Sequence, residues 1–326
     1  LASARSARYQ EAMARLQENA RFAMETMSRS VRNTGYLGCG AVSKFANVVN
    51  GGRNNWWLNL ERPIVGFEGG ISTLPAEITS PASDPNVPLS VVKPAIDGSD
   101  AFISVSLDDS EELSVISHDP IGGQINTVAH SIQPGNIAII TDCNHTALFQ
   151  VSGPSNTSSI EHNIGTAKPG NCQKELGANC GAPILQNYTF RPGATIMQLS
   201  SNAFYIGEAS AGNSHSLWTV SLGVNKNNGD LITPATELVQ GVDDMQILYG
   251  EDTDKDGYPN RYISADAVTD WPAIVSLQIS LLMSTIEDGM ASSPQTYEFN
   301  GQSITAKDRR VRRTYTSVIN LRNRSN

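Results

Sequence analysis

The chain has 326 residues, with 23 Lys and Arg against 32 Asp and Glu, and a formal net charge of −9. Because phosphate binding needs clustered Lys and Arg, this balance argues against nucleic acid as a partner. The sequence contains no run of about eighteen apolar residues, so no membrane-spanning helix is predicted. The 27 Gly and 16 Pro residues favour a turn-rich β protein over a helical bundle.

Residues 2–33 predict one long amphipathic helix. Glu11 and Arg15, and likewise Glu25 and Arg29, lie four residues apart on a face that suits water. No capping sequence opens this helix, whereas Gly35 suits its end, so we expect it to be the second half of a longer helix. Apolar residues at three-and-four spacing form a stripe that needs a partner: Tyr9, Met13, Leu16, Ala20, Ala23, Met24, Met27 and Val31.

Beyond Gly35 the helical period is lost, and Gly and Pro residues punctuate an irregular stretch as far as Pro94. Residues 155–187 are rich in Ser, Asn and Gly and predict a loop excursion on the surface. Strands are predicted before and after it, at 101–107, 136–141, 147–152, 203–208, 217–222, 244–249, 274–283 and 314–321.

The strands do not alternate with helices, and no repeat of 20 to 50 residues is visible. We therefore expect an α+β fold in which the long helix packs on an antiparallel β-sheet with large loop and strand insertions. The predicted division is the helix at 1–34 and a β-rich globular domain at 35–326, which includes a disulfide-containing loop region around 155–190.

Four cysteines allow three pairings. We predict a disulfide between Cys172 and Cys180, which closes a short polar loop. We predict a second one between Cys39 and Cys143, which ties the end of the helix to a β segment and implies an oxidising compartment. Four buried free thiols are the alternative.

The run Asp252-Thr253-Asp254-Lys255-Asp256-Gly257 places three carboxylates at alternate positions before a Gly that permits a tight turn. Calcium prefers such oxygen ligands, and the candidate ligands are Asp252, Asp254, Asp256, the Tyr258 carbonyl and Asn260. The twelfth position is Ile263 instead of the usual Glu. A structural calcium loop and an Asp/Gly-rich hairpin without metal both fit this sequence.

Catalytic residues are not predicted, because no G-x-S-x-G, H-E-x-x-H or phosphate-cradling glycine motif occurs. We interpret Cys143, with Asp142 and His145 nearby, as a half-cystine beside polar residues. The pair Trp56-Trp57 is either an interface anchor or a core anchor for a long loop. A basic cluster, which either complements an acidic partner or is a solvated loop, comprises Lys307, Arg309, Arg310, Arg312 and Arg313.

Four runs together resemble the PilW-type minor pilins of the bacterial type IV pilus, which belong to the prepilin and pseudopilin superfamily. The resemblance extends to the Asp252–Gly257 loop and to the strand after Trp271, whereas residues 50–234 match only loosely. The runs are RLQENARFAME at 15–25, RNTGYLGC at 32–39, GVDDMQILYG at 241–250 and LRNR at 321–324.

This resemblance implies a pilin-like fold and a non-enzymatic role. Such a subunit joins other minor pilins and the major pilin in a tip complex that primes assembly and can present an adhesin. The family's apolar first helix half anchors in the inner membrane, and this sequence lacks it. The globular domain would lie in the periplasm of the cell envelope and later in the extracellular pilus. The helix stripe would then be divided between the chain's own sheet and neighbouring subunits, with contacts at Tyr9, Met13, Leu16, Met24 and Met27.

Two alternatives remain open at the level of sequence. The J-type pseudopilin of a type II secretion system resembles PilW and shares this architecture. A secreted calcium-dependent carbohydrate-binding domain would account for the Asp loop, the disulfides and Trp56-Trp57, but it does not explain the helix.

Overall fold

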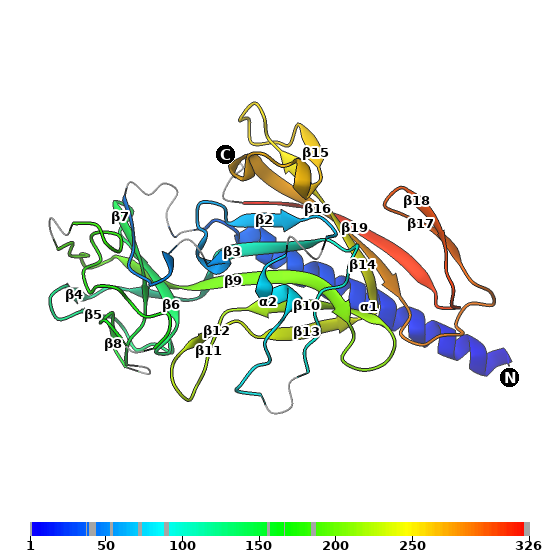
Figure 1. Cartoon of the computed structure of the whole chain (residues 1–326), viewed down its shortest axis with the longest axis horizontal. Helices are drawn as coiled ribbons and strands as arrows, with labels where there is room; N and C mark the ends of the chain where they lie inside the picture. The colour runs from blue at the N-terminus through cyan, green and yellow to red at the C-terminus, as the bar shows by residue number, and fades with distance from the viewer. Residues whose placement is uncertain are drawn as a thin grey trace.

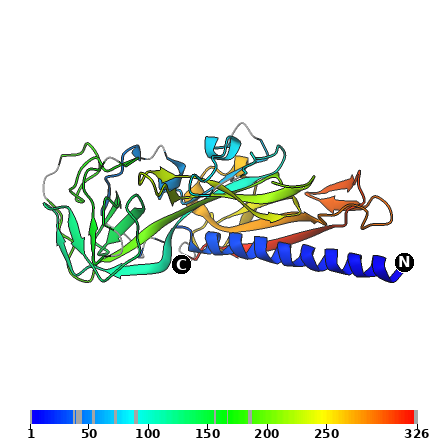
Figure 2. The ribbon, with the colours of Figure 1, turned by 90° about the horizontal axis from the view of Figure 1, so that it is seen from below.

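The computed structural model describes residues 2–36, 38, 44–52, 55–70, 74–87, 91–154, 157–165, 167–183 and 187–322. One long helix, α1 (Ala2–Asn33), lies along one side of an elongated array of strands (Figures 1 and 2). Within the described ranges, no helix has both the length and the apolar character needed to cross a membrane. The short helical turns are η2 (Trp56–Leu58), α2 (Ala76–Thr79), η4 (Ala265–Ala267) and η5 (Trp271–Ala273).

The largest sheet has eight strands, and its longest members are β3 (Ala101–Ser114) and β9 (Thr195–Glu208). The first part of β9 pairs with β6, its second part pairs with β10, and β3 runs beside most of it. A single strand therefore links the two ends of the molecule. The remaining strands are β1 (Lys44–Asn47), β2 (Ile64–Phe67), β6 (Ile137–Thr141), β7 (His145–Gln150), β10 (His215–Ser221) and β13 (Ala235–Gln240).

A second sheet has the strand order β15-β14-β16-β19, and its neighbouring strands are antiparallel. Leu277, Ile279 and Leu281 of β16 are fully buried, while Gln278 and Ser280 between them are partly exposed. The strand predicted at 274–283 is confirmed, and this alternation is typical of a half-buried strand. The bounds are β14 (Val242–Glu251), β15 (Arg261–Ile263), β16 (Ile274–Ser284) and β19 (Arg312–Asn320).

Three small sheets decorate this framework. The pair β11 (Gly223–Val224) and β12 (Leu231–Ile232) and the pair β17 (Thr296–Phe299) and β18 (Gln302–Thr305) are hairpins. The third sheet has the order β4-β5-β8 and lies far from the start of α1 (Figure 1). Its strands are β4 (Ser117–Asp119), β5 (Gln124–Asn126) and β8 (Ser159–Glu161).

The buried face of α1 packs where the two large sheets meet. Its side chains share a core with Phe102 and Leu217 of the first sheet and with Ile247 and Leu277 of the second. Burying a large apolar side chain stabilises the fold by roughly 1.5 to 3 kcal/mol, so this stripe fixes the helix firmly. The helix residues in this core are Leu16, Ala20, Ala23, Met27 and Val31.

The expected α+β class, a pilin-like helix on one antiparallel sheet with insertions, is wrong. Strands make up 40% of the structure and helices 14%, and several sheets form a curled half-barrel. The helix contacts β3 and β13 of one sheet as well as β16 and β19 of another. Local alternation predicts where strands occur, but sheet membership depends on long-range pairing that the local pattern does not specify.

The segment around 155–190 contains the predicted disulfide between Cys172 and Cys180, which is confirmed. It is not merely a surface excursion, because Leu176 and Phe190 are buried in a third core at this end of the molecule. Cys143 is also disulfide-bonded. Its predicted partner Cys39 lies outside the described residues, so that pairing stays a prediction.

Candidate interaction surface

Helix α1 has one side buried in the chain's own core and one side open to other molecules. Of the predicted interface residues, Leu16 and Met27 are buried, and Met13 and Met24 are partly buried. Tyr9 is 38% exposed. The chain's own sheets therefore cover most of the predicted stripe, and Tyr9 is the member that remains available.

The open side of α1 carries an aromatic residue that the stripe does not include. Phe22 is 48% exposed, although its neighbour Ala23 is fully buried. Aromatic side chains with exposed area are typical anchors of protein interfaces. Sequence reasoning missed Phe22 because it interrupts the three-and-four spacing, and that off-stripe position was the available signal.

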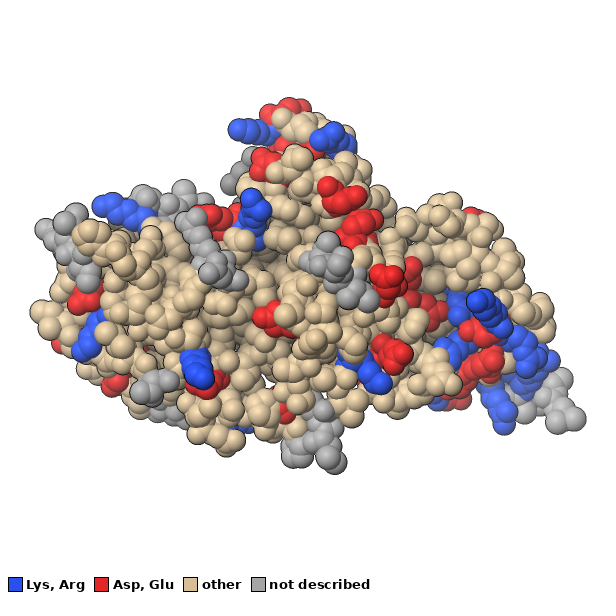
Figure 3. Space-filling model, in the orientation of Figure 1, with Lys and Arg blue, Asp and Glu red and all other residues tan. Residues whose placement is uncertain are grey.

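The charge of α1 differs in sign from that of the rest of the chain. The helix carries six arginines and three glutamates, a formal charge of +3. Since the whole chain carries −9, the residues outside the helix carry −12. Basic side chains gather at the end of the molecule where α1 begins (Figure 3). Arg15 pairs with Glu11 at 2.5 Å and with Glu287 at 3.2 Å. Such exposed pairs contribute little to stability, so the charges on this side of α1 matter mainly for binding other molecules.

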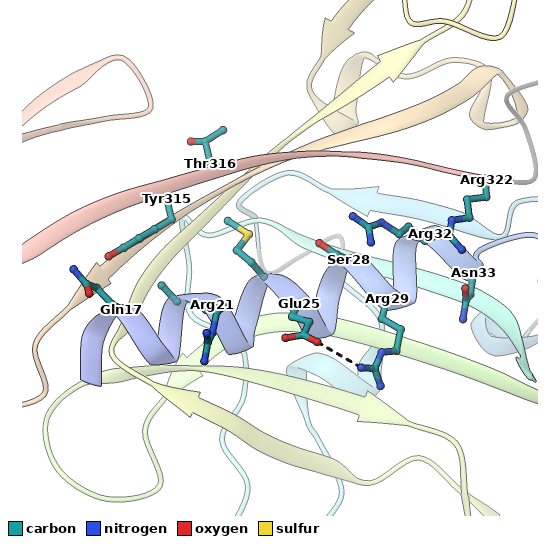
Figure 4. A pocket seen from close by; sticks show the side chains of 12 residues that line it. Gln17, Arg21, Glu25, Ser28, Arg29, Arg32, Asn33, Tyr315, Thr316 and Arg322 are labelled. Carbon is teal, nitrogen blue, oxygen red and sulfur yellow. Dashed lines mark ion pairs between the residues drawn. The ribbon is translucent and has the colours of Figure 1, made fainter. Parts of the chain in front are cut away.

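A groove of about 600 Å³ lies between α1 and β19 (Figure 4). Its lining by described residues includes Arg21, Arg29, Arg32 and Arg322 but a single acidic residue, Glu25. Glu25 pairs with Arg29 at 3.7 Å, whereas Arg21, Arg32 and Arg322 make no ion pair with any described residue. The groove therefore presents uncompensated positive charge inside an acidic protein, which favours an acidic partner. Sequence analysis placed Glu25 and Arg29 on the water-facing side of the helix but did not predict the groove, because Arg322 reaches the helix only through the fold.

The start of β19 is held by a partly buried group of charges. Arg312 bonds to Asp308 at 2.6 Å and to Asp243 at 2.9 Å, and its side chain is 11% exposed. The hydrogen bond with Asp308 raises the pKa of Arg312 above its usual value. Arg312 of the predicted basic cluster therefore joins β19 to β14 and is not free for a partner.

The Asp252–Gly257 loop connects β14 with β15, and its three carboxylates do converge. One oxygen each of Asp252, Asp254 and Asp256 lie within 4.8 Å of one another. Asp252 accepts backbone N–H groups from Lys255 at 2.6 Å and Gly257 at 2.8 Å, which closes the turn. These three carboxylates fit a hard cation such as calcium.

The other two predicted calcium ligands are less well placed. Asn260 Oδ1 accepts both the N–H of Thr253 at 2.6 Å and its hydroxyl at 2.9 Å, so this oxygen is already engaged. The Tyr258 side chain is 73% exposed, and its N–H donates to Asp256 at 2.8 Å. Calcium binding therefore stays a prediction that depends on three carboxylates plus the Tyr258 carbonyl or water.

The tryptophan pair anchors a core and does not form an exposed platform. Trp57 is 6% exposed, and Trp56 is partly buried against the same core. A sugar-binding site would need aromatic faces open to ligand. This arrangement removes the main structural support for a carbohydrate-binding reading.

A chain of hydrogen bonds through two buried histidines organises the end of the molecule that is distant from the start of α1. The Phe190 N–H donates to His118 Nδ1 at 3.1 Å, so the proton of His118 lies on Nε2 and donates to His162 Nε2 at 3.1 Å. His162 Nδ1–H donates to the Lys174 carbonyl at 2.8 Å, inside the disulfide loop. Burial lowers the pKa of both histidines to about 4. The facing nitrogens already share one proton, so this pair is not arranged to hold a metal.

A buried carboxylate joins the two large sheets near α1. Asp100 accepts the N–H of Gly69 at 3.0 Å and the N–H of Ile247 at 2.7 Å. Its own N–H donates to the Met245 carbonyl at 2.8 Å. Burial raises the pKa of Asp100 to about 7. The carboxyl group thus bridges the start of β3 to the edge of β14.

Comparison with protein families gives one match, and it covers the C-terminal part of the chain. Residues 203–323 match the family model described as type IV pilus-assembly protein W, which is a little over a third of the chain. The match supports assignment to the PilW family. It runs from β9 to the end of β19 and so includes three strands that contact α1, namely β13, β16 and β19. Comparisons with curated proteins and with solved structures give no match.

Proposed function

We propose that this protein is a non-enzymatic subunit of type IV pilus assembly and acts through the open side of α1 and the groove beside β19. The observation that carries the proposal is the PilW family match over residues 203–323. The matched strands hold the helix in place, and the helix in turn presents Phe22 and the unpaired arginines. Assembly proteins act through such surfaces, so the partner contacts are the functional site.

The finer role that we propose is participation with other minor pilins and the major pilin in the complex that primes assembly and remains at the pilus tip. The molecule is elongated, and the β4-β5-β8 sheet lies beyond the C-terminal end of α1 (Figure 2). This shape supports contacts with other subunits along α1 and leaves the opposite end free to present an adhesin. The place of action is the bacterial cell envelope, first at the inner membrane and then at the tip.

Deletion of the gene tests this proposal. We expect surface pili to be lost or sharply reduced while bulk protein secretion continues, because a priming subunit serves the pilus alone. Electron microscopy of the cells and a protein assay of the medium give the two readouts. Normal piliation would contradict the proposal, and lost secretion with normal pili would indicate the J-type pseudopilin instead.

We also propose that the Asp252–Gly257 loop binds calcium as a structural ion. Three convergent carboxylates repel one another, and a bound cation would neutralise them and rigidify the turn. We expect the melting temperature to rise with micromolar calcium and to fall with chelator. Asp254→Asn, which removes one ligand charge from an exposed position, should abolish the calcium effect. No shift in either direction would contradict this proposal.

A further inference from the structure

Strand β19 is an edge strand with backbone groups that face away from its sheet. It pairs with β16 and with no other described strand. The pairing is antiparallel and without a register shift, so backbone groups alternate strictly between β16 and the open edge. Natural edge strands are usually shielded by lysines, prolines or bulges, because an open edge pairs readily with other chains.

The hydrogen bonds at both ends fix which residues face outward. The N–H of Leu321 donates to the Val275 carbonyl at 2.9 Å, so odd-numbered residues bond toward β16. The backbone N–H and carbonyl of Arg312 face the open edge. Its N–H donates to Gln295 Oε1 at 2.8 Å, and its carbonyl accepts from Gln295 Nε2 at 3.1 Å. One position of the edge is therefore covered by a side chain. The outward residues that follow have exposed side chains, and their backbone groups find no partner among the described residues: Thr314, Thr316, Val318 and Asn320.

This open edge borders the arginine-lined groove. Tyr315, Thr316 and Arg322 line the groove from the side of β19, and Arg21 and Arg32 line it from α1 (Figure 4). Arg21 and Arg32 are eleven residues apart on the helix, about 16 Å at 1.5 Å per residue. An extended strand covers that length with about five residues at 3.3 Å each. Outward-facing residues from Thr314 to Asn320 are enough to pair with such a strand.

We propose that an extended, acidic segment of another pilus-assembly subunit adds to the open edge of β19 and places its carboxylates against Arg21, Arg32 and Arg322. Backbone pairing supplies affinity in strand addition, and side-chain pockets supply specificity. Charge selects the occupant, because the groove is basic while the rest of this chain carries −12. The identity of the partner rests on the proposed function, whereas the mode of binding rests on β19 alone.

A designed peptide tests the mode of binding directly. The probe is a fluorescein-labelled nonapeptide of alternating Thr and Glu, with a Thr/Lys peptide as its control, and anisotropy on the purified chain reports affinity. We expect the acidic peptide to bind at least tenfold more tightly than the basic one. Equal affinity for the two peptides would overturn the proposal.

Two pairs of variants separate the backbone contribution from the charge contribution. Thr316→Pro removes an outward N–H that does not bond to β16 and also fixes φ at this position, whereas Thr316→Val keeps the N–H. Both variants lose the Thr316 hydroxyl that bonds to Ser280. Arg21→Glu with Arg32→Glu reverses the groove charge, and Arg8→Glu reverses an exposed charge on the same helix outside it. We expect at least a tenfold loss for Thr316→Pro and for the double variant, and less than a twofold change for each control.

The same variants show which proposal fails if one does. If the deletion strain still makes pili, the proposed function is wrong. If the deletion strain lacks pili and expression of the Thr316→Pro variant restores them as well as the Thr316→Val variant does, the proposed function stands and only the strand-addition proposal is wrong. Dimerisation of the purified chain that Thr316→Pro abolishes would show that the occupant is a second copy and would overturn the acidic partner.

Discussion

The two ends of this molecule are stabilised by different means. The helix end, which we define as α1 with β13, β14, β16 and β19, is built from long elements whose apolar side chains interlock. The distal end, which we define as residues 115–194, combines short strands with a disulfide and buried histidines. The family match reaches the helix end and not the distal end. Because the match covers strands that contact α1, we place the proposed assembly surface at the helix end.

The two ends should also respond to acid in opposite directions. At the helix end, Asp100 accepts the N–H of Ile247 in β14, and burial raises its pKa from 3.8 to about 7. Its contribution to stability is therefore full at low pH and is lost as the pH rises from about 4 to about 7. The buried histidines titrate at about 4 instead of 6.5, so their contribution is present above pH 6.5 and is lost as the pH falls toward 4.

The largest expected effect concerns the buried side of α1. Met27→Ala should lower the free energy of unfolding by about 2 to 5 kcal/mol, because Met27 is fully buried where the helix meets both sheets. Phe22→Ala, on the open side, should change it by less than about 0.5 kcal/mol. Urea unfolding of both variants makes this measurement. Similar losses for the two variants would show that the sides of the helix are not distinct.

A second prediction tests the acid response of the distal end. Between pH 6.5 and 4 the unfolded chain binds a proton at His162 that the folded chain does not, at a cost on the order of 3 kcal/mol. Protonation would also place a hydrogen on both facing Nε2 atoms and break the bridge between His118 and His162. Asp119 and Lys174 are the charged groups that act on this pair.

The measurement is the free energy of unfolding in urea at pH 7 and pH 4.5. The variant His118→Gln with His162→Asn should lose most of the acid sensitivity. His215→Gln, in β10 near α1, should keep it. Acid sensitivity that is unchanged in the double variant would place its origin elsewhere.

A third, smaller effect belongs to the disulfide. Cys172→Ser with Cys180→Ser should cost roughly 2 to 3 kcal/mol, because the bond closes only a short loop in the unfolded chain. The loss should be local, since the Lys174 carbonyl in that loop accepts from His162. Hydrogen exchange should therefore increase in residues 157–183 and stay unchanged in β14, β16 and β19. A uniform increase across the chain would contradict a separate distal unit.

How far the sequence predicts this molecule also differs between the ends. The helix at 2–33 is confirmed, and the strand predicted at 314–321 agrees closely with β19, because strong periodicity marks long amphipathic elements. The expected α+β fold with the helix on one antiparallel sheet is wrong, because α1 contacts strands of two different sheets. The histidine bridge could not be predicted, because His118 and His162 lie 44 residues apart and meet only through tertiary packing.

The candidate surface shows the same limit. The stripe identified Leu16 and Met27, which the fold uses internally, and it missed Phe22 and the groove arginines. An amphipathic pattern predicts which side of a helix is buried but not whether the partner is the same chain. The charge of the helix is a signal that the stripe does not use, because a helix of +3 in a chain of −9 marks a surface of distinct polarity.

Site-specific photocrosslinking in cells with a working pilus system tests the central claim most directly. A photoreactive amino acid replaces Phe22, which is 48% exposed on α1, or Ile121, which is 76% exposed at the distal end. We predict covalent adducts with other pilus-assembly subunits from position 22 and none with those subunits from position 121. Adducts with pilus subunits from position 121, with none from position 22, would contradict the claim that this chain assembles through its helix.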